Sequence, residues 1–100
     1  MPSLAYRLRL KVWAYSGHAA WYFVTLPKRE AREIKGLLGE AARGWGSLRV
    51  VATVGDTTWK TSIFPDKASR SYVLPIKASV RKAEHIEADK VIAIQVHVSD

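Results

Sequence analysis

The chain has 100 residues, and its 16 lysines and arginines against 9 acidic residues give a formal net charge of +7 at neutral pH. This length makes one domain, residues 1–100, which can bury a core but excludes a two-domain enzyme with a deep cleft between its lobes. The sequence contains no cysteine, which excludes disulfides, thiolate metal sites and a cysteine nucleophile. It also has no signal-peptide pattern and no apolar run long enough to span a bilayer, so we expect a cytoplasmic protein without a membrane partner.

The first half of the sequence predicts two strands, a helix and a third strand. Apolar and basic residues alternate over residues 4–15, and residues 20–26 are rich in aromatic and β-branched side chains. We expect these two strands to form an antiparallel hairpin across the turn residues 16–18. Pro27 then favours a helix start, and apolar residues recur at helical spacing from Ala31 to Ala41. After the glycines at 44 and 46, alternation predicts a third strand over residues 48–54.

The second half predicts the same order of elements. Gly55-Asp56 fits a two-residue turn into a fourth strand, which runs through Ile63 and which Pro65-Asp66-Lys67 is expected to end. A short fifth strand over 71–76, a short helix over 79–84 and a sixth strand over 90–98 follow. Since each half then reads strand, strand, helix, strand, we expect internal repeats of about residues 1–55 and 56–100. Leu26-Pro27 corresponds to Leu74-Pro75 in this repeat.

The fold class expected from these elements is mainly β, with six strands and two short helices. Because apolar alternation runs through all six strands, a flat sheet with one covered face would leave apolar side chains exposed. The sheet should therefore curl into a barrel whose openings the two helices cap. The alternative is an open α+β sandwich with both helices on one face of the sheet.

Three stretches of the sequence, residues 21–27, 59–65 and 74–83, carry a family resemblance. In this order they resemble a family of small bacterial and archaeal proteins of unknown function, also found fused to YdeI/OmpD-associated, or bacteriocin-protection, domains. The resemblance implies a pseudo-twofold double-split β-barrel, similar to AbrB-like folds. In those relatives two subunits of about half this size complete the barrel, so this chain is expected to be a monomer or a weak homodimer. Ala88 stands where the family commonly has glycine, which implies a less tight turn. The family brings no agreed activity.

No catalytic or metal constellation emerges from the sequence. His18, His85 and His97 lack the paired spacing of metal ligands, and the acidic residues that follow His85 read as a solvated turn. Ser79 and Lys82 match a Ser-x-x-Lys string, but the companion motifs of that enzyme class are missing. We therefore expect a binding module that is not an enzyme and needs no cofactor or metal.

Basic residues next to aromatic ones are the main candidates for binding. The outward positions of the first strand carry cations followed by two aromatics, and a second basic group surrounds the second helix. The nucleic-acid-binding candidates are Arg7, Arg9, Lys11, Trp13, Tyr15, Lys77, Arg81 and Lys82. Cations attract phosphates and aromatic rings can stack on bases, so weak, sequence-independent nucleic-acid binding is the leading hypothesis. AbrB-like relatives also use a basic surface on DNA. The alternative is that these charges only keep the protein soluble.

The four tryptophans suggest a competing function. Two or three of them are expected in the core, but an aromatic pocket for a small molecule would also need such residues. The ligand-pocket candidates are Trp21, Trp59 and Tyr72. The competing hypothesis is thus an accessory domain that binds a protein partner or a small apolar ligand through exposed Trp and Tyr, centred on Trp13, Tyr15 and Trp59.

Overall fold

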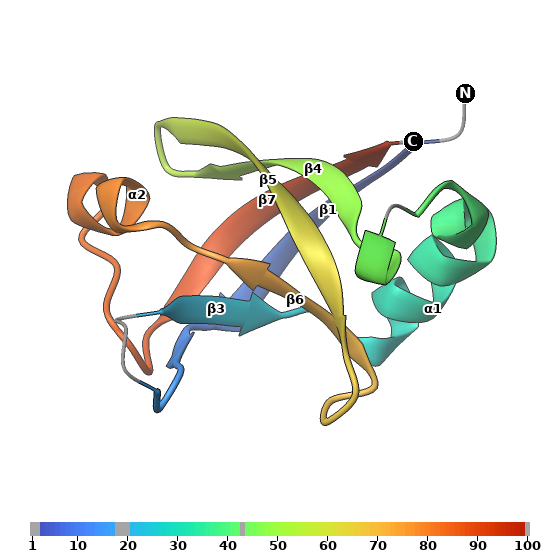
Figure 1. Cartoon of the computed structure of the whole chain (residues 1–100). Coiled ribbons are helices and arrows are strands. Elements are labelled where there is room, and N and C mark those ends of the chain that lie inside the picture. Colours follow the sequence, from blue (N-terminus) through green and yellow to red (C-terminus); the bar gives the residue numbers. More distant parts are fainter. Residues whose placement is uncertain (1–2, 18–20, 43, 100) are drawn as a thin grey trace.

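The computed structural model describes residues 3–17, 21–42 and 44–99, and seven strands in it form one antiparallel sheet (Figure 1). The strands are β1 (Ser3–Lys11), β2 (Trp13–Ala14), β3 (Tyr22–Thr25), β4 (Leu48–Val54), β5 (Thr57–Asp66), β6 (Ser71–Pro75) and β7 (Val91–Ser99). The helices are α1 (Lys28–Leu38) and α2 (Ala78–Ala83), and two short 3₁₀ segments, Gly39–Ala41 and Gly44–Gly46, connect α1 to β4. The order of strands in the sheet is β1-β7-β4-β5-β6-β3-β2. The protein is therefore mainly β, as the sequence predicted.

A bend at Val12 curls the sheet. The two ends of the strand order, β1 and β2, are neighbours in the chain with only Val12 between them. Val12 is fully buried; its N–H donates to the Lys90 carbonyl oxygen at 2.8 Å and its carbonyl accepts from the Asp89 N–H at 2.7 Å. β1 pairs with β7 along its whole length, whereas β2 pairs with β3. The bent stretch β1–β2 thus contributes both outermost strands of the strand order, and the sheet curls into a half-barrel.

β5 changes partners in a similar way. Its residues up to Ile63 pair with β4, and its residues from Phe64 pair with β6. Pro65 lies inside this strand, opposite Tyr72, and the strand ends one residue later at Asp66, within the predicted stop at residues 65–67. Proline is tolerated there because β5 has exchanged β4 for β6 at this point, and no ladder hydrogen bond from residue 65 to β4 is required.

The first predicted strand also differs from the structure. The bend at Val12 divides residues 4–15 into β1 and β2, which is why there are seven strands instead of six. The predicted hairpin is limited to two pairs, Trp13 with Phe23 and Ala14 with Tyr22, and β1 takes the C-terminal strand as its partner. The predicted turn and second strand also include residues 18–20, which lie outside the described part of the chain.

The core lies between the inner face of the curled sheet and the two helices. Figure 1 shows α1 and α2 at opposite ends of the curled sheet. The helix predicted up to Ala41 ends as an α-helix at Leu38, and Gly39–Ala41 continue as a 3₁₀ turn. The buried side chains of α1 follow one another at helical spacing, and those of β4 and β7 alternate with exposed ones. The main buried residues are Ala31, Ile34, Leu38, Leu48, Val50, Ala52, Ile63, Leu74, Val80, Ile94, Val96 and Val98.

Polar contacts hold each helix against the sheet. The Tyr6 hydroxyl on β1 donates to Glu33 Oε1 on α1 at 2.5 Å. At the other end, the Thr57 hydroxyl at the start of β5 donates to Glu84 Oε2, just after α2, at 2.6 Å. Gly55 in the β4–β5 turn has φ of +57°, and its Cα lies close to the Glu84 carboxylate. The positive φ favours glycine at this position of the turn.

Replacing Tyr6 by Phe should lower the free energy of unfolding by about 1 kcal/mol at about pH 8, because one hydrogen bond to a charged, solvent-screened carboxylate is lost. Burial, the Glu33 hydrogen bond and the charges of Glu33 and Glu30 raise the pKa of Tyr6 above its ordinary value of 10.0. The unfolded chain therefore releases this proton first, and the stabilisation should decline as the pH rises above that value. Urea unfolding of both proteins at about pH 8 and about pH 11 measures this decline.

Tyr15→Phe is the matched control, since the Tyr15 side chain is exposed and has no hydrogen bond within the described residues. It should leave the free energy of unfolding unchanged at both pH values. A gap between the protein and its Tyr6→Phe variant that stays the same at both pH values would contradict the role given to this contact.

Candidate nucleic-acid interface

The outward face of β1, β7, β4 and β5 is an uncovered basic surface. Directly opposite residues of an antiparallel sheet share a face, and the pairing brings His97, Val51 and Lys60 into one row across three strands. In the same way Arg7 lies opposite Gln95. All of these side chains are exposed. The five cations of this face define what we call the basic sheet face: Arg7, Arg9 and Lys11 of β1, Arg49 of β4 and Lys60 of β5.

The basic sheet face has no acidic side chain to neutralise it. Neither aspartate nor glutamate occurs in β1, β7, β4 or residues 57–64 of β5; the one acidic residue of these strands, Asp66, lies at the end of β5 and accepts two hydrogen bonds from Ser69 in the following turn. Within the same part of the chain, none of the five cations has an ion pair or a side-chain hydrogen bond. Small or uncharged residues separate them, such as Ala93 opposite Arg9 and Ser62 opposite Arg49. Unpaired cations on one face create a positive potential that attracts polyanions.

Aromatic side chains adjoin the basic sheet face at its β5 side. A surface hollow of about 590 Å³ is lined by Arg49 and Lys60 together with Trp21 and Phe64. Trp21 is 55 % exposed and Phe64 is 40 % exposed, so both rings are accessible. Cations and open aromatic rings therefore meet at one place on the surface.

Three residues of this site were missed by the sequence analysis. Arg49, Lys60 and Phe64 lie on β4 and β5, far along the chain from the first strand. Alternation within each strand could have identified the two cations as outward-facing, because Leu48, Val50 and Trp59 point inward around them. The sequence did not indicate that these strands share a face with Arg7, since that depends on β7 lying between β1 and β4.

The predicted row of cations running into aromatics is interrupted. Arg7, Arg9 and Lys11 are exposed on β1, as predicted, but the bend at Val12 moves the next residues onto the part of the sheet that contains β3. Trp13 is half-buried there: its Nε1 donates to Thr25 Oγ1 at 2.8 Å and its ring stacks on Phe23, with ring centroids 4.9 Å apart. Tyr15 is exposed beyond the bend. Trp13 therefore serves packing and is not a continuation of the cationic row.

The second predicted basic group is only partly available for binding. Arg81 Nε donates to the Ile76 carbonyl oxygen at 3.1 Å, and its guanidinium lies 4.0 Å from the centre of the Tyr22 ring. Arg81 thus anchors α2 against β3. Lys77 is exposed and shares a smaller hollow, of about 290 Å³, with Lys60 and Trp21, which places it beside the basic sheet face. Lys82 is exposed on α2.

The three predicted pocket residues do not form one pocket. Trp59 is only 6 % exposed and pairs with Ala52 inside the sheet, so it belongs mainly to the core. Trp21 and Trp59 both line the smaller hollow, whereas Tyr72 lines a different hollow next to α1. Of the four tryptophans, only Trp59 is buried, whereas Trp45 is 96 % exposed. The expectation of two or three core tryptophans was therefore too high.

Metal ligands do not gather in residues 3–17, 21–42 and 44–99, where no three His, Asp or Glu side chains lie together. His18 lies outside these ranges. Over the same described residues, no helix has both the length and the apolar character that crossing a membrane requires.

Comparison with protein-family models shows which family the chain is similar to. A family model described as "Domain of unknown function (DUF1905)" matches residues 9–96, from within β1 to within β7. The range includes four of the five cations of the basic sheet face, all except Arg7. No curated protein matches the sequence. The match confirms the resemblance to a domain of unknown function, while bacterial or archaeal origin and fusion to other domains stay predictions.

Proposed function

We propose, for a chain that belongs to the DUF1905 family of domains of unknown function, that the basic sheet face binds single-stranded nucleic acid weakly and without reading its sequence. The observation that carries this proposal is the acid-free outward face with its five unpaired cations. Each phosphate contact displaces counterions from the nucleic acid, and this entropy gain drives binding at low salt. No activity accompanies the family description, so the proposal rests on the surface itself.

The adjoining aromatics favour a single strand over a duplex. Trp21 and Phe64 lie beside Arg49 and Lys60, and unpaired bases can stack on such rings for about 1–3 kcal/mol per base. Bases inside a duplex cannot reach them. Binding without sequence preference is expected because the five cations would contact phosphates, which carry no base information.

An anisotropy titration with a labelled oligothymidylate of about 15 nucleotides tests this function. If three of the five cations contact phosphates, the Kd should rise about 100-fold between about 20 mM and about 200 mM salt. A duplex of the same length should bind more weakly, and polyphosphate should bind without changing the fluorescence of Trp21. Absence of binding at low salt, or a Kd indifferent to salt, would contradict the proposal.

The alternative is an accessory domain that binds a protein partner or an apolar ligand through exposed Trp and Tyr, and a second titration tests it. That alternative was centred on Trp13, Tyr15 and Trp59, of which only Tyr15 is well exposed. Its remaining support is the exposure of Trp21 and Trp45. A salt-independent change in tryptophan fluorescence on adding a neutral aromatic compound would favour it.

We also propose that the half-barrel is a double-split barrel produced by duplication of residues 1–55 and 56–100. Two features support it. The stretch that contains β1 and β2 changes its pairing partner midway, and so does β5. In the strand order, β7 and β4 lie next to each other between β1 and β5. Such a barrel is complete within one chain, so the protein would not need a second copy to close it, and we propose a monomer or weak homodimer. We also propose that the protein is cytoplasmic.

A further inference from the structure

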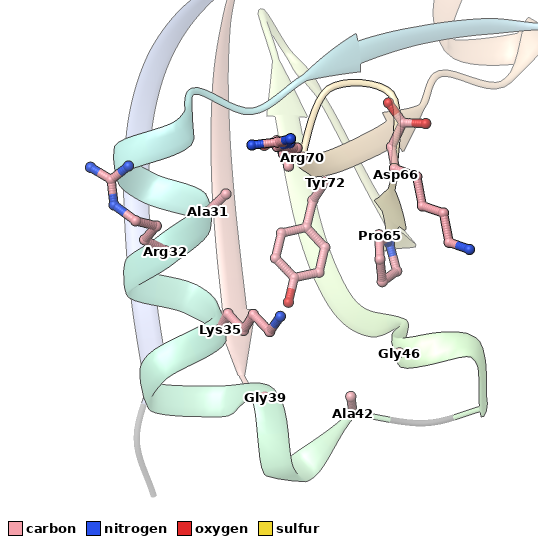
Figure 2. Close-up of a pocket in the computed structure, with 12 residues that line it drawn as sticks. Ala31, Arg32, Lys35, Gly39, Ala42, Gly46, Pro65, Asp66, Arg70 and Tyr72 are labelled. Atoms are coloured by element: carbon pink, nitrogen blue, oxygen red, sulfur yellow. The ribbon is translucent and has the colours of Figure 1, made fainter.

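A separate hollow lies at the opposite end of the molecule from α2. It has a volume of about 530 Å³ and is bounded by α1, the 3₁₀ segments that follow it and the turn between β5 and β6 (Figure 2). None of the five cations of the basic sheet face lines it. A hollow of this size is large enough for a small organic molecule.

Tyr72 presents its hydroxyl to this hollow. The side chain as a whole is only 6 % exposed, and Figure 2 shows the hydroxyl directed into the hollow. Within the described residues the hydroxyl has no protein partner and is not a buried unsatisfied group, so it is open to the hollow and free to bond a ligand there. Burial raises the pKa of Tyr72 above its ordinary value of 10.0, so the hydroxyl keeps its proton at neutral pH and can donate it to an acceptor.

Three cations line this hollow besides Arg32. Lys35 of α1 extends toward the Tyr72 hydroxyl, whereas Arg70 comes from the β5–β6 turn and lies near the other end of the Tyr72 side chain (Figure 2); Lys67 also lines the hollow. None of these three cations has an ion pair within the described residues. The only acidic residue in the lining, Asp66, uses its Oδ2 inside the turn, where it accepts from the Ser69 N–H at 3.1 Å and the Ser69 hydroxyl at 2.7 Å.

Part of the wall of the hollow is apolar. Ala31, Ala42 and Pro65 line it beside the Tyr72 ring. At Gly46 φ is +77°, and a Cβ would meet Pro65 Cγ at 2.8 Å, so only glycine lets the chain pass here. Arg70 also has a positive φ, of +56°, a conformation that costs free energy in a residue other than glycine and that often occurs at binding sites.

We propose that this hollow binds a small organic anion with an apolar body. Its carboxylate or phosphate group would accept the hydrogen bond of the Tyr72 hydroxyl beside the Lys35 ammonium group, and Arg70 would add positive charge at the other side of the hollow. Its apolar body would pack on Ala31, Ala42 and Pro65. The site is independent of the basic sheet face, so it adds a ligand to the proposed function and does not depend on it.

Titration of the ¹⁵N-labelled protein with benzoate, phenyl phosphate and neutral benzamide tests the proposal by the shifts of backbone amide signals. Both anions should move the signals of Lys35, Ala42, Gly46 and Arg70 at concentrations up to about 10 mM, and benzamide should not. Whichever of the two anions binds more tightly shows whether the site prefers a carboxylate or a phosphate group. Tyr72→Phe, which keeps the ring, and Lys35→Gln should each weaken binding of that anion about tenfold, because each removes one interaction with a charged group.

Lys28→Gln is the matched control, since it removes an exposed cation from the same helix but not from the lining. It should leave the affinity for the anion unchanged. Equal binding of benzamide and benzoate, no shifts with either anion, or equal affinity of the protein and its Tyr72→Phe variant would each overturn the proposal. Tyr72→Phe should also leave the affinity for oligothymidylate unchanged, so the proposed anion site and the proposed nucleic-acid binding are tested independently.

Discussion

Replacing Arg7, Arg49 and Lys60 together by glutamine should weaken binding of oligothymidylate about 100-fold at about 20 mM salt, because about 1 kcal/mol is lost for each phosphate contact. The three residues lie on β1, β4 and β5 and span the basic sheet face. All three are exposed, and glutamine retains a long polar side chain, so the stability of the fold should change little. Fluorescence anisotropy measures the loss, and circular dichroism checks that the variant is folded.

A second triple variant controls for net charge. Lys28, Arg29 and Arg32 are exposed on α1, outside the basic sheet face, and their replacement by glutamine removes the same three charges. This variant should lose less than about fivefold in affinity, through long-range electrostatics alone. Equal losses in both variants would show that total charge, and not this face, determines binding.

Replacing Trp59 by Ala should lower the free energy of unfolding by about 3–5 kcal/mol, the largest effect on stability that we expect. The side chain lies inside the curled sheet opposite Ala52, and removing it leaves a cavity that the neighbouring strands cannot close. Small domains are stable by only about 5–15 kcal/mol, so this variant should be largely unfolded at moderate urea concentrations. Urea unfolding followed by circular dichroism measures the change.

Trp21→Ala provides the comparison, because the Trp21 ring is 55 % exposed and stacks on Phe23, with ring centroids 6.1 Å apart. Its cost should stay below about 1 kcal/mol. If Trp59→Ala were as mild as Trp21→Ala, Trp59 would not be a core residue, and an aromatic ligand pocket centred on it would become the better interpretation.

The sequence predicted the strands better than it predicted their partners. Alternation identified β4, β6 and β7 nearly to their ends, because inward and outward side chains differ in polarity along each of them. The bend at Val12 left no such signal, since Val12 points inward as the alternation of residues 4–15 requires. The pairing of β1 with β7 joins the two ends of the chain, and no local pattern specifies such a distant partner.

The candidate site was predictable where its residues lie on one strand, and it was not predictable where they depend on how strands pair. Arg7, Arg9 and Lys11 were expected on an exposed strand face, and they lie there. Trp13 was wrongly placed beside them, because its hydrogen bond to Thr25 and its stacking on Phe23 depend on the β2–β3 pairing. The hollow beside α1 was not predicted, since the residues that make it come from three separate segments of the chain.

The salt dependence of oligothymidylate binding, measured side by side for the protein and the Arg7, Arg49, Lys60 triple variant, tests the central claim most directly. Each phosphate contact contributes about 0.7 to the slope of log Kd against log salt concentration for a single strand. The protein should show a slope of about 2 to 3.5, and the triple variant a slope lower by about 2. Equal slopes for the two proteins would contradict the assignment of binding to the basic sheet face.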